Sequence, residues 1–145
     1  MTNDNNKKDT LRRAWEKAAQ KLEGYHIHIY VNPKDWKELN AANTLANNIQ
    51  TLFGKDVKDV HTIRPVGPHT QENIAVEITK EGFGKIIPWL QLNNKENLSI
   101  LIHPETGDLR GDHHEAALWL GKPVALNEQF FDKVAPKKAN GPRQP

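Results

Sequence analysis

The chain has 145 residues, of which 37% are hydrophobic, and its formal net charge at neutral pH is only +2. A chain of this size and composition fits one domain with a modest core, and so small a basic excess, part of it in the terminal segments, argues against a nucleic-acid partner. It contains no cysteine, which excludes disulfides, thiolate nucleophiles and thiolate metal ligands, so any metal must be held by histidine and carboxylate.

The N-terminal segment, residues 1–22, is polar and lacks an apolar stretch that could serve as a signal peptide. Within it, Leu11, Trp15 and Leu22 recur at helical spacing, which predicts a short helix before Gly24. No part of the chain approaches the roughly twenty apolar residues of a membrane span. We therefore expect a cytoplasmic protein with no membrane partner.

From Tyr25 onward, the hydrophobic pattern predicts a regular succession of strands and helices. Asp35 is a suitable N-cap for the first helix of this region, and Gly54 is suited to end it. The alternation of Ile74, Val76 and Ile78 is typical of a half-buried strand. The predicted elements are strand 25–31, helix 36–53, strand 59–66, strand 72–79, helix 84–92, strand 98–103 and helix 112–120.

This β-α-β-β-α-β order indicates an α+β fold, the ferredoxin-like sandwich, in which a four-stranded antiparallel sheet carries both helices on one face. Short extra helices are expected at the N-terminal and C-terminal ends. We predict a single domain over 23–131, preceded by the segment 1–22 and followed by a disordered tail over 132–145 that is rich in lysine, proline and glycine.

Two histidines stand one residue apart in the first strand. Because successive side chains of a strand point to opposite faces, His26 and His28 should share one face, while Ile27 and Ile29 are buried on the other. A third histidine, His103, ends the last predicted strand. In the antiparallel order that strand lies beside the first, which brings the three imidazoles together as candidate metal ligands.

Glu77 reaches the same end of the sheet, on the third predicted strand. It is a candidate carboxylate ligand or a residue that orients an imidazole. The sheet face that carries the histidines is unusually polar, yet it includes large side chains. We therefore expect this face to bind a ligand and to be covered by a second subunit. Its members are His26, His28, Tyr30, Glu77, Thr79, Ser99, Leu101 and His103.

Five short motifs follow one another between Tyr25 and Leu126. Each is weak alone, but the set and its order are specific. The motifs are Tyr25-His26-Ile27-His28-Ile29-Tyr30, Pro65-Val66-Gly67-Pro68-His69, Pro88-Trp89-Leu90-Gln91-Leu92-Asn93, His103-Pro104-Glu105-Thr106-Gly107-Asp108, and Asp112-His113 with Trp119-Leu120-Gly121.

Together these motifs resemble the DOPA 4,5-dioxygenase family. The resemblance implies extradiol cleavage of a catechol ring by O₂ with non-haem Fe(II), for which Zn(II) or Mn(II) are possible substitutes, in a small ferredoxin-like homodimer. The chain departs from the family pattern at Thr70, where proline is expected. It departs again at Ala116 and Ala117, where a second histidine often follows the one at His113.

His69 lies in a loop that starts at the far end of the sheet from His103. Six strand residues separate those ends by about 20 Å. His69 can therefore join the site only if the loop folds back over the sheet or comes from another subunit, and a turn histidine beside Gly67 is the competing interpretation. The family resemblance favours a role as ligand or acid/base catalyst.

His113 follows Asp112, which we predict to be the N-cap of the last helix. A surface position in the first turn and a contact with substrate are both open; the resemblance favours a catalytic role. Several other residues have structural interpretations: His61 and His114 as surface residues, Arg64 in a cross-strand salt bridge, and Trp89 and Trp119 in the core.

An alternative function is a non-catalytic module with the same fold, which binds a metal or small ligand as a dimer without turnover. Coordination separates the two functions. A closed four-ligand site favours a structural role, whereas three protein ligands beside a pocket large enough for an aromatic ring favour catalysis.

Overall fold

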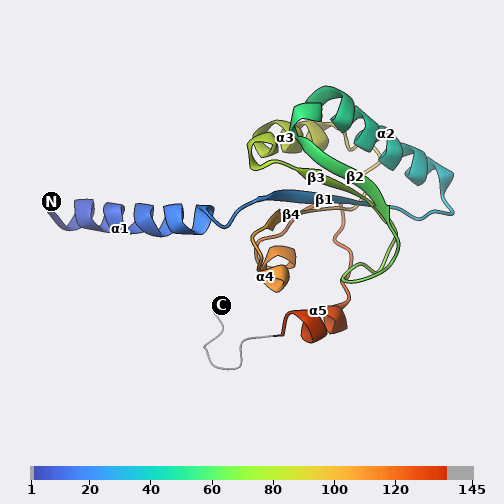
Figure 1. Cartoon of the computed structure of the whole chain (residues 1–145). Helices are drawn as coiled ribbons and strands as arrows, with labels where there is room; N and C mark the ends of the chain where they lie inside the picture. Colours follow the sequence, from blue (N-terminus) through green and yellow to red (C-terminus); the bar gives the residue numbers. More distant parts are fainter. Residues whose placement is uncertain (1, 137–145) are drawn as a thin grey trace.

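The computed structural model describes residues 2–136. Its core is an antiparallel sheet with helices on both sides (Figure 1). The elements are α1 (Thr2–Ala19), β1 (Gly24–Tyr30), α2 (Trp36–Phe53), η1 (Gly54–Asp56), β2 (Val57–Ile63), β3 (Asn73–Ile78), η2 (Lys80–Gly82), α3 (Phe83–Asn93), β4 (Ile100–Glu105), α4 (Leu109–His113), β5 (Leu118–Leu120) and α5 (Glu128–Val134). No helix among the described residues is both long and apolar enough to span a membrane.

The sheet has five strands in the order β2-β3-β1-β4-β5, and every neighbouring pair is antiparallel. The α+β class and the position of β1 between β3 and β4 are as predicted. The predicted four-stranded ferredoxin-like sheet is one strand short, because β5 pairs with the outer edge of β4.

The error lies in the helix predicted over 112–120. The helix spans only Leu109–His113, and its N-cap is Asp108, whose side chain accepts a hydrogen bond from the backbone N–H of Gly111. Leu118–Leu120 was expected to be helical because of its apolar residues, but the exposed edge of β4 offers backbone hydrogen bonds that a local pattern cannot reveal.

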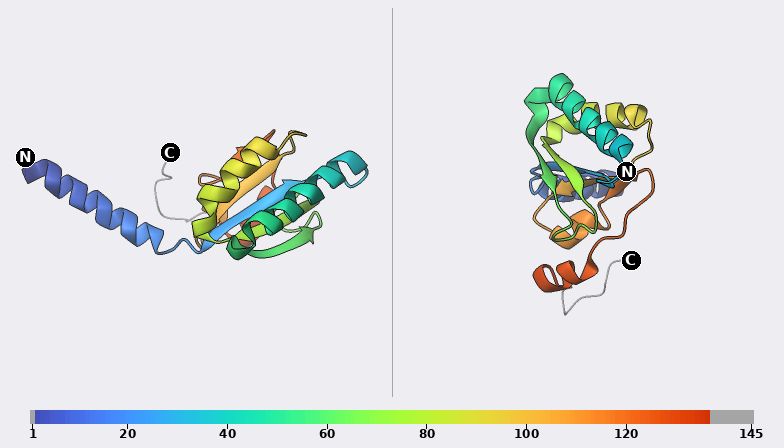
Figure 2. Two further views of the ribbon diagram at one scale, coloured as in Figure 1. Left: turned by 90° about the horizontal axis from the view of Figure 1, so that it is seen from above. Right: turned by 90° about the vertical axis from the view of Figure 1, so that its right-hand side faces the viewer.

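The helices at both ends of the chain differ from the ones predicted there. Helix α1 begins at Thr2 and ends at Ala19, so it is much longer than the short helix expected. It projects away from the sheet (Figures 1 and 2). At the other end, the limit set at residue 131 falls inside α5, whose Phe131 is fully buried. The rest of the predicted disordered tail, residues 137–145, lies outside the described residues.

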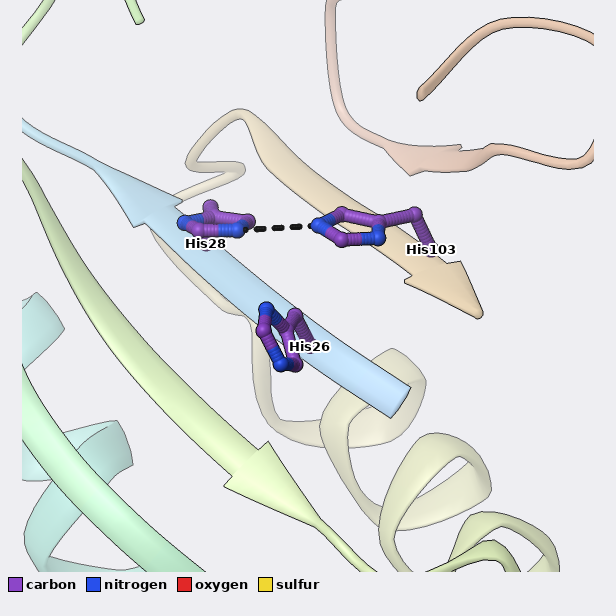
Figure 3. Close-up of side chains that lie close together, drawn as sticks. All are labelled: His26, His28 and His103. Carbon is purple, nitrogen blue, oxygen red and sulfur yellow. Dashed lines mark hydrogen bonds between the residues drawn. The ribbon is translucent and has the colours of Figure 1, made fainter. Parts of the chain in front are cut away.

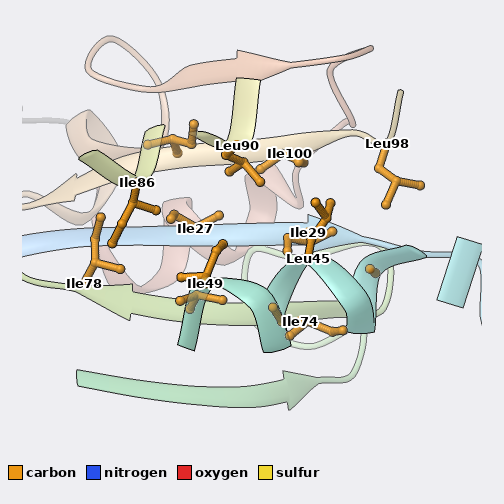
Figure 4. Packing of buried hydrophobic residues seen from close by; sticks show 14 of the residues in the cluster. Ile27, Ile29, Leu45, Ile49, Ile74, Ile78, Ile86, Leu90, Leu98 and Ile100 are labelled. Carbon is orange, nitrogen blue, oxygen red and sulfur yellow. The ribbon is translucent and has the colours of Figure 1, made fainter. Parts of the chain in front are cut away.

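Helices α2 and α3 cover one face of the sheet and enclose the hydrophobic core (Figures 2 and 4). Asp35 caps α2 as predicted, because its side chain accepts hydrogen bonds from the backbone N–H groups of Lys37 and Glu38. The core consists of Ile27, Ile29, Val31, Ala42, Leu45, Ala46, Ile49, Ile74, Val76, Ile78, Ile86, Ile87, Leu90, Leu98, Ile100 and Ile102.

The opposite face of the sheet is covered by α4, α5 and the chain between β2 and β3 (Figure 1). These segments bury its centre almost as completely as the core: Tyr30 is 1% exposed, His103 2% and His28 3%. Burial of these side chains therefore needs no second subunit, contrary to the expectation from sequence.

Candidate metal centre

Three histidines meet on this second face. Strand β1 points His26 and His28 to the same side, and His103 on β4 stands directly opposite His26 in the strand register. One ring nitrogen from each of the three lies within 4.8 Å of the others, close enough to bind one metal ion (Figure 3). The structure thus brings these three side chains together, as predicted from the sequence.

A line of short contacts passes through His28 and His103. Nδ1 of His28 lies 2.9 Å from Oδ1 of Asn73, the Nε2 atoms of the two imidazoles lie 3.1 Å apart, and Nδ1 of His103 lies 2.9 Å from the carbonyl oxygen of Pro104. Two neutral imidazoles carry only two N–H protons between them. Three hydrogen bonds would need three, so one contact lacks a proton.

Burial keeps these rings neutral. It is the largest cause that holds the pKa of His28 well below its usual value, followed by the charges of His69 and His103. Burial likewise lowers the pKa of His103 to about 3. A third proton is therefore not taken up near neutral pH. A divalent cation bound by these two imidazoles would supply the missing positive charge, and neutral imidazole is the form that binds metal.

Two carboxylates flank His26. Its Nε2 lies 3.2 Å from Oε1 of Glu77 and 3.2 Å from Oε2 of Glu105. Glu77, proposed from sequence as a ligand or an orienting residue, thus contacts His26 and is outside the group of three histidines. Glu105 was missed, although it stands two residues after His103 in the same strand and therefore shares its face.

The loop before β3 folds back over the sheet and brings in His69 from the same chain. An isolated β-bridge joins His69 to Leu126, and Oγ1 of Thr70 donates a hydrogen bond to the carbonyl of Ala125 at 2.6 Å. The ring centroid of His69 lies 4.3 Å from that of His28. The separation of about 20 Å expected from strand geometry therefore does not keep His69 from the cluster.

Tyr30 orients His69. Its hydroxyl is buried and lies 2.8 Å from Nδ1 of His69, its one hydrogen-bond partner among residues 2–136. This contact engages Nδ1 and leaves Nε2 of His69 available to another group. Burial, then the charges of His113 and His26, lowers the pKa of His69 to about 4.

His113 also belongs to the cluster and is only 6% exposed, so the surface interpretation was wrong. Its ring centroid lies 3.9 Å from that of His103, and its Nδ1–H donates to the carbonyl of Leu109 at 2.8 Å, which leaves Nε2 free to accept. Burial is the main cause that lowers its pKa.

Buried Asp112 fixes the entrance to α4. It is not the N-cap that we predicted: its carboxylate accepts hydrogen bonds from the backbone N–H and the hydroxyl of Thr106 at 2.9 and 2.6 Å. This anchors the turn between β4 and α4, and with it the position of His113.

The other aromatic and basic residues divide between the two faces. Trp89 packs against the core as predicted. Trp119 does not: it stacks on Tyr30 on the histidine face, with ring centroids 5.9 Å apart. His61 is exposed as predicted, whereas His114 is partly buried.

Two basic side chains remain, His114 and Arg64. Partial burial lowers the pKa of His114, but its contacts with Glu128 and the carbonyl of Arg110 outweigh this, and the net pKa is raised. The salt bridge predicted for Arg64 is absent among residues 2–136.

The histidine cluster lies between two hollows. One of about 500 Å³ is bordered by His113, Trp119 and Leu126, and it is large enough for an aromatic ring. A smaller one of about 250 Å³ is bordered by His26 and both of its carboxylate neighbours. A groove of about 490 Å³ between α2 and α3 contains no histidine and lacks this chemistry.

Comparison with known proteins agrees with this picture. Residues 25–130 match the model of the Dopa 4,5-dioxygenase family. A protein of Botryotinia fuckeliana described as an "uncharacterized 21.2 kDa protein" is 29% identical over 88% of this chain and 76% of its own length.

Two further proteins are similar. The DOPA 4,5-dioxygenase of Amanita muscaria is 29% identical over 73% of this chain, which spans about half (48%) of that enzyme's length. The crystal structure of a "putative dioxygenase" from Nostoc punctiforme has 34% identity and a TM-score of 0.60, and the match covers 79% of this chain and 96% of that one.

Proposed function

The chain belongs to the Dopa 4,5-dioxygenase family, and from that premise we propose that it is an extradiol dioxygenase, which opens the ring of a catechol with O₂ and non-haem Fe(II). DOPA or a related dihydroxyphenyl compound is the substrate class. The observation that carries this proposal is the His28–His103 pair, whose two protons cannot satisfy three contacts. A site that lacks positive charge between two buried nitrogens is suited to a metal ion.

His26, His28 and His103 would hold the metal. Imidazole suits Fe(II) and equally Zn(II), so the donor set fits the family's metal without selecting it alone. When bound, Fe(II) supplies a centre that binds the catechol oxygens and O₂ and passes electron density between them. Glu77 and Glu105 would orient His26, as carboxylates commonly do for metal-binding imidazoles.

Two further histidines are placed to act on the substrate. Nε2 of His113 is free to accept a proton, because its Nδ1–H is already engaged, and His113 borders the larger hollow. It can take a catechol proton and, as the imidazolium, return that proton to an oxygen during ring opening. Nε2 of His69 is not engaged by Tyr30, so the neutral ring of His69 can form a hydrogen bond there with an oxygen of the substrate.

The hollow beside His113 is the proposed substrate pocket. Trp119 and Leu126 offer apolar surface to an aromatic ring, while His113 faces it with a polar edge. None of the three candidate metal ligands lines this pocket; His113 connects it to them, because its ring centroid lies 3.9 Å from that of His103.

Anaerobic loading with Fe(II), followed by L-DOPA, caffeate or protocatechuate and then air, tests this function. A yellow ring-opened product that requires Fe(II) is expected, and the His28→Ala variant should form none. His61→Ala is the matched control, because His61 is exposed, contacts Asp59 and is not one of the three candidate ligands, so the variant should leave the rate unchanged. A protein that binds metal stoichiometrically yet opens none of these rings would instead be the non-catalytic binding module.

We also propose that two copies form a homodimer through α1. Leu11 and Trp15 share one face of this helix and are 61% and 65% exposed, although most helical stability in proteins comes from packing of an apolar face against a partner. Residues 2–22 carry six basic and three acidic side chains, whereas residues 23–136 carry eleven basic and fifteen acidic ones. The helix of one copy is thus complementary in charge to the domain of the other.

Sedimentation analysis of the full chain at micromolar concentration tests the dimer. The double variant Leu11→Glu, Trp15→Glu should be monomeric, whereas Leu52→Glu, which places the same charge on an equally exposed apolar position of α2, should remain dimeric. A wild-type protein that sediments as a monomer rejects this proposal and leaves the enzymatic one untouched.

A further inference from the structure

Asn73 begins β3, and its fully buried side chain lies on the sheet face that carries the histidines. Its amide contacts two groups. Oδ1 lies 2.9 Å from Nδ1 of His28, and Nδ2 donates a hydrogen bond to the carbonyl of Gln71 at 3.3 Å. The Gln71 carbonyl can only accept, so it sets the orientation of the amide: the NH₂ group must face Gln71, and the oxygen must face His28.

The oxygen of Asn73 in turn selects a tautomer. With the ring proton on Nδ1, His28 donates to Asn73 and its Nε2 lone pair points at His103. With the proton on Nε2, His28 would donate to His103, but its Nδ1 lone pair would face an oxygen that cannot donate. Either tautomer leaves one buried contact of this line between two acceptors, at a cost of about 1–3 kcal/mol. The contacts of the two Nδ1 atoms with oxygen are shorter, 2.9 Å each, than the 3.1 Å contact between the Nε2 atoms, which favours protons on both Nδ1 atoms.

His103 meets the same constraint from the main chain. Its Nδ1–H donates to the carbonyl of Pro104, so its Nε2 is also a lone pair. Both Nε2 atoms then face each other across 3.1 Å without a proton between them. In this arrangement the contact that lacks a proton is the one between His28 and His103. These two nitrogens are therefore the ones left free to bind a cation.

We propose that Asn73 is a positioning residue that holds His28 in the Nδ1–H tautomer and thereby turns its Nε2 lone pair toward His103, which prepares the pair to bind a divalent cation. The statement about the tautomer stands on the contacts alone. The consequence for metal binding rests on the proposed function. Asn73 is the informative position, because the corresponding acceptor for His103 is a backbone carbonyl that a substitution cannot remove.

Long-range ¹H–¹⁵N correlation spectra of the metal-free protein test the tautomer directly, since they distinguish protonated from unprotonated ring nitrogens. The full chain is measured in the presence of a chelator near pH 7.5, and the signals of His28 are assigned by their loss in His28→Ala. We expect the proton on Nδ1 in the wild type. A wild-type proton on Nε2 overturns the proposal, whatever any variant does.

Three variants sharpen the test. Asn73→Leu removes the acceptor and should move the His28 proton to Nε2, whereas Asn73→Asp keeps an acceptor and should keep the proton on Nδ1. Asn94→Leu is the control: Asn94 also bridges backbone groups, its side chain bonding to both the N–H and the carbonyl of Leu98, but it lies outside the cluster. It should destabilise the fold and leave the His28 signals unchanged.

Zn(II) titration provides the second readout. Loss of a group that orients a metal-binding histidine typically costs 10- to 100-fold in affinity, so Asn73→Leu should bind Zn(II) about 10- to 100-fold more weakly, with affinity recovered in Asn73→Asp. Equal affinity in the wild type and Asn73→Leu contradicts the metal-binding consequence. A protein that shows both effects but never opens a catechol refutes the proposed function and leaves the role of Asn73 in place.

Discussion

The two faces of the sheet are buried to the same depth by different means. Ile27 and His28 are neighbours in β1, one fully buried beneath α2 and α3 and the other 3% exposed beneath α4, α5 and the returning loop. The first face needs only apolar volume. The second must also provide hydrogen-bond partners for ring nitrogens, because a buried polar group without one is costly. Equal burial therefore does not mean an equal role.

This contrast indicates where the molecule carries its chemistry. Burying isoleucine side chains on this face would cost less free energy than burying imidazoles. The histidines therefore lower the stability of the protein relative to an apolar face. Its partners are specific: an asparagine, a tyrosine hydroxyl and two backbone carbonyls each engage one ring nitrogen. Variants that change one face and leave the other intact would separate the contributions of the two faces to stability and metal binding.

Acid should destabilise the protein through the histidine face. The pKa values of His69 and His103 are lowered to about 4 and about 3, whereas an unfolded histidine titrates near 6.5. Below pH 6.5 the unfolded chain therefore binds more protons than the folded one. Stability is constant above about pH 7 and falls as the pH drops, by about 1.4 kcal/mol per pH unit for each histidine that stays neutral.

Urea unfolding of the metal-free protein between pH 8 and pH 4 measures this slope. His69→Gln should reduce it, and His61→Ala, an exposed histidine, should not. A free energy of unfolding that does not change between pH 6.5 and pH 4.5 would mean that the buried imidazoles accept protons without cost.

On the helix-covered face, Ile27→Ala should lower the free energy of unfolding by about 2–5 kcal/mol, because it leaves a cavity in the packed core. The Zn(II) stoichiometry of the folded variant should stay unchanged, since Ile27 points away from the histidines. Denaturant unfolding and metal titration of the same sample check both statements. A loss of metal binding in the folded state would show that the two faces are not independent.

The two tyrosines of the chain offer a matched pair on one strand, since Tyr30 lies on the histidine face and Tyr25 packs against Phe83 near the core. Tyr30→Phe removes the hydroxyl that forms a hydrogen bond with His69 and should cost about 1–3 kcal/mol of stability. Tyr25→Phe should cost less than half as much, because no hydrogen bond of its hydroxyl is recorded among residues 2–136. Similar costs for the two variants would argue that the Tyr30–His69 contact contributes nothing.

The smallest effect is expected at the carboxylates beside His26. Glu77→Gln and Glu105→Gln remove equivalent contacts of 3.2 Å, so each should weaken Zn(II) binding by about 10-fold. Equal losses mean that both residues orient His26. A far larger loss for Glu77→Gln alone would make Glu77 a metal ligand, as the sequence first suggested.

Much of the fold follows from local pattern. The alternation in β1 correctly assigned Ile27 and Ile29 to the core and His26 and His28 to the other face, because a strand has a strict two-residue period. The bounds of α2 followed from its cap and its apolar spacing. Apart from the α4–β5 region and the two ends, the predicted strands and helices lie within three residues of the observed ones.

Prediction from the hydrophobic pattern failed for segments whose structure depends on the elements they pack against. Strand β5 is three residues long and exists because β4 has a free edge, and α1 is helical over a stretch whose apolar residues are too few to indicate its full length. Trp119 was assigned to the core because a tryptophan is usually buried there. Only the position of β5 beside β4 places it against Tyr30 on the other face.

The sequence by itself determined the family, the strand that bears two histidines on one face, and the meeting of His26 with His103, since residue spacing and antiparallel order are local or topological properties. Only the tertiary structure decided that His69 and His113 join them and that Asn73 and Tyr30 orient their neighbours. The reason is physical: a hydrogen-bond partner for a buried ring is chosen by which segments pack together, and folding alone brings those distant segments into contact.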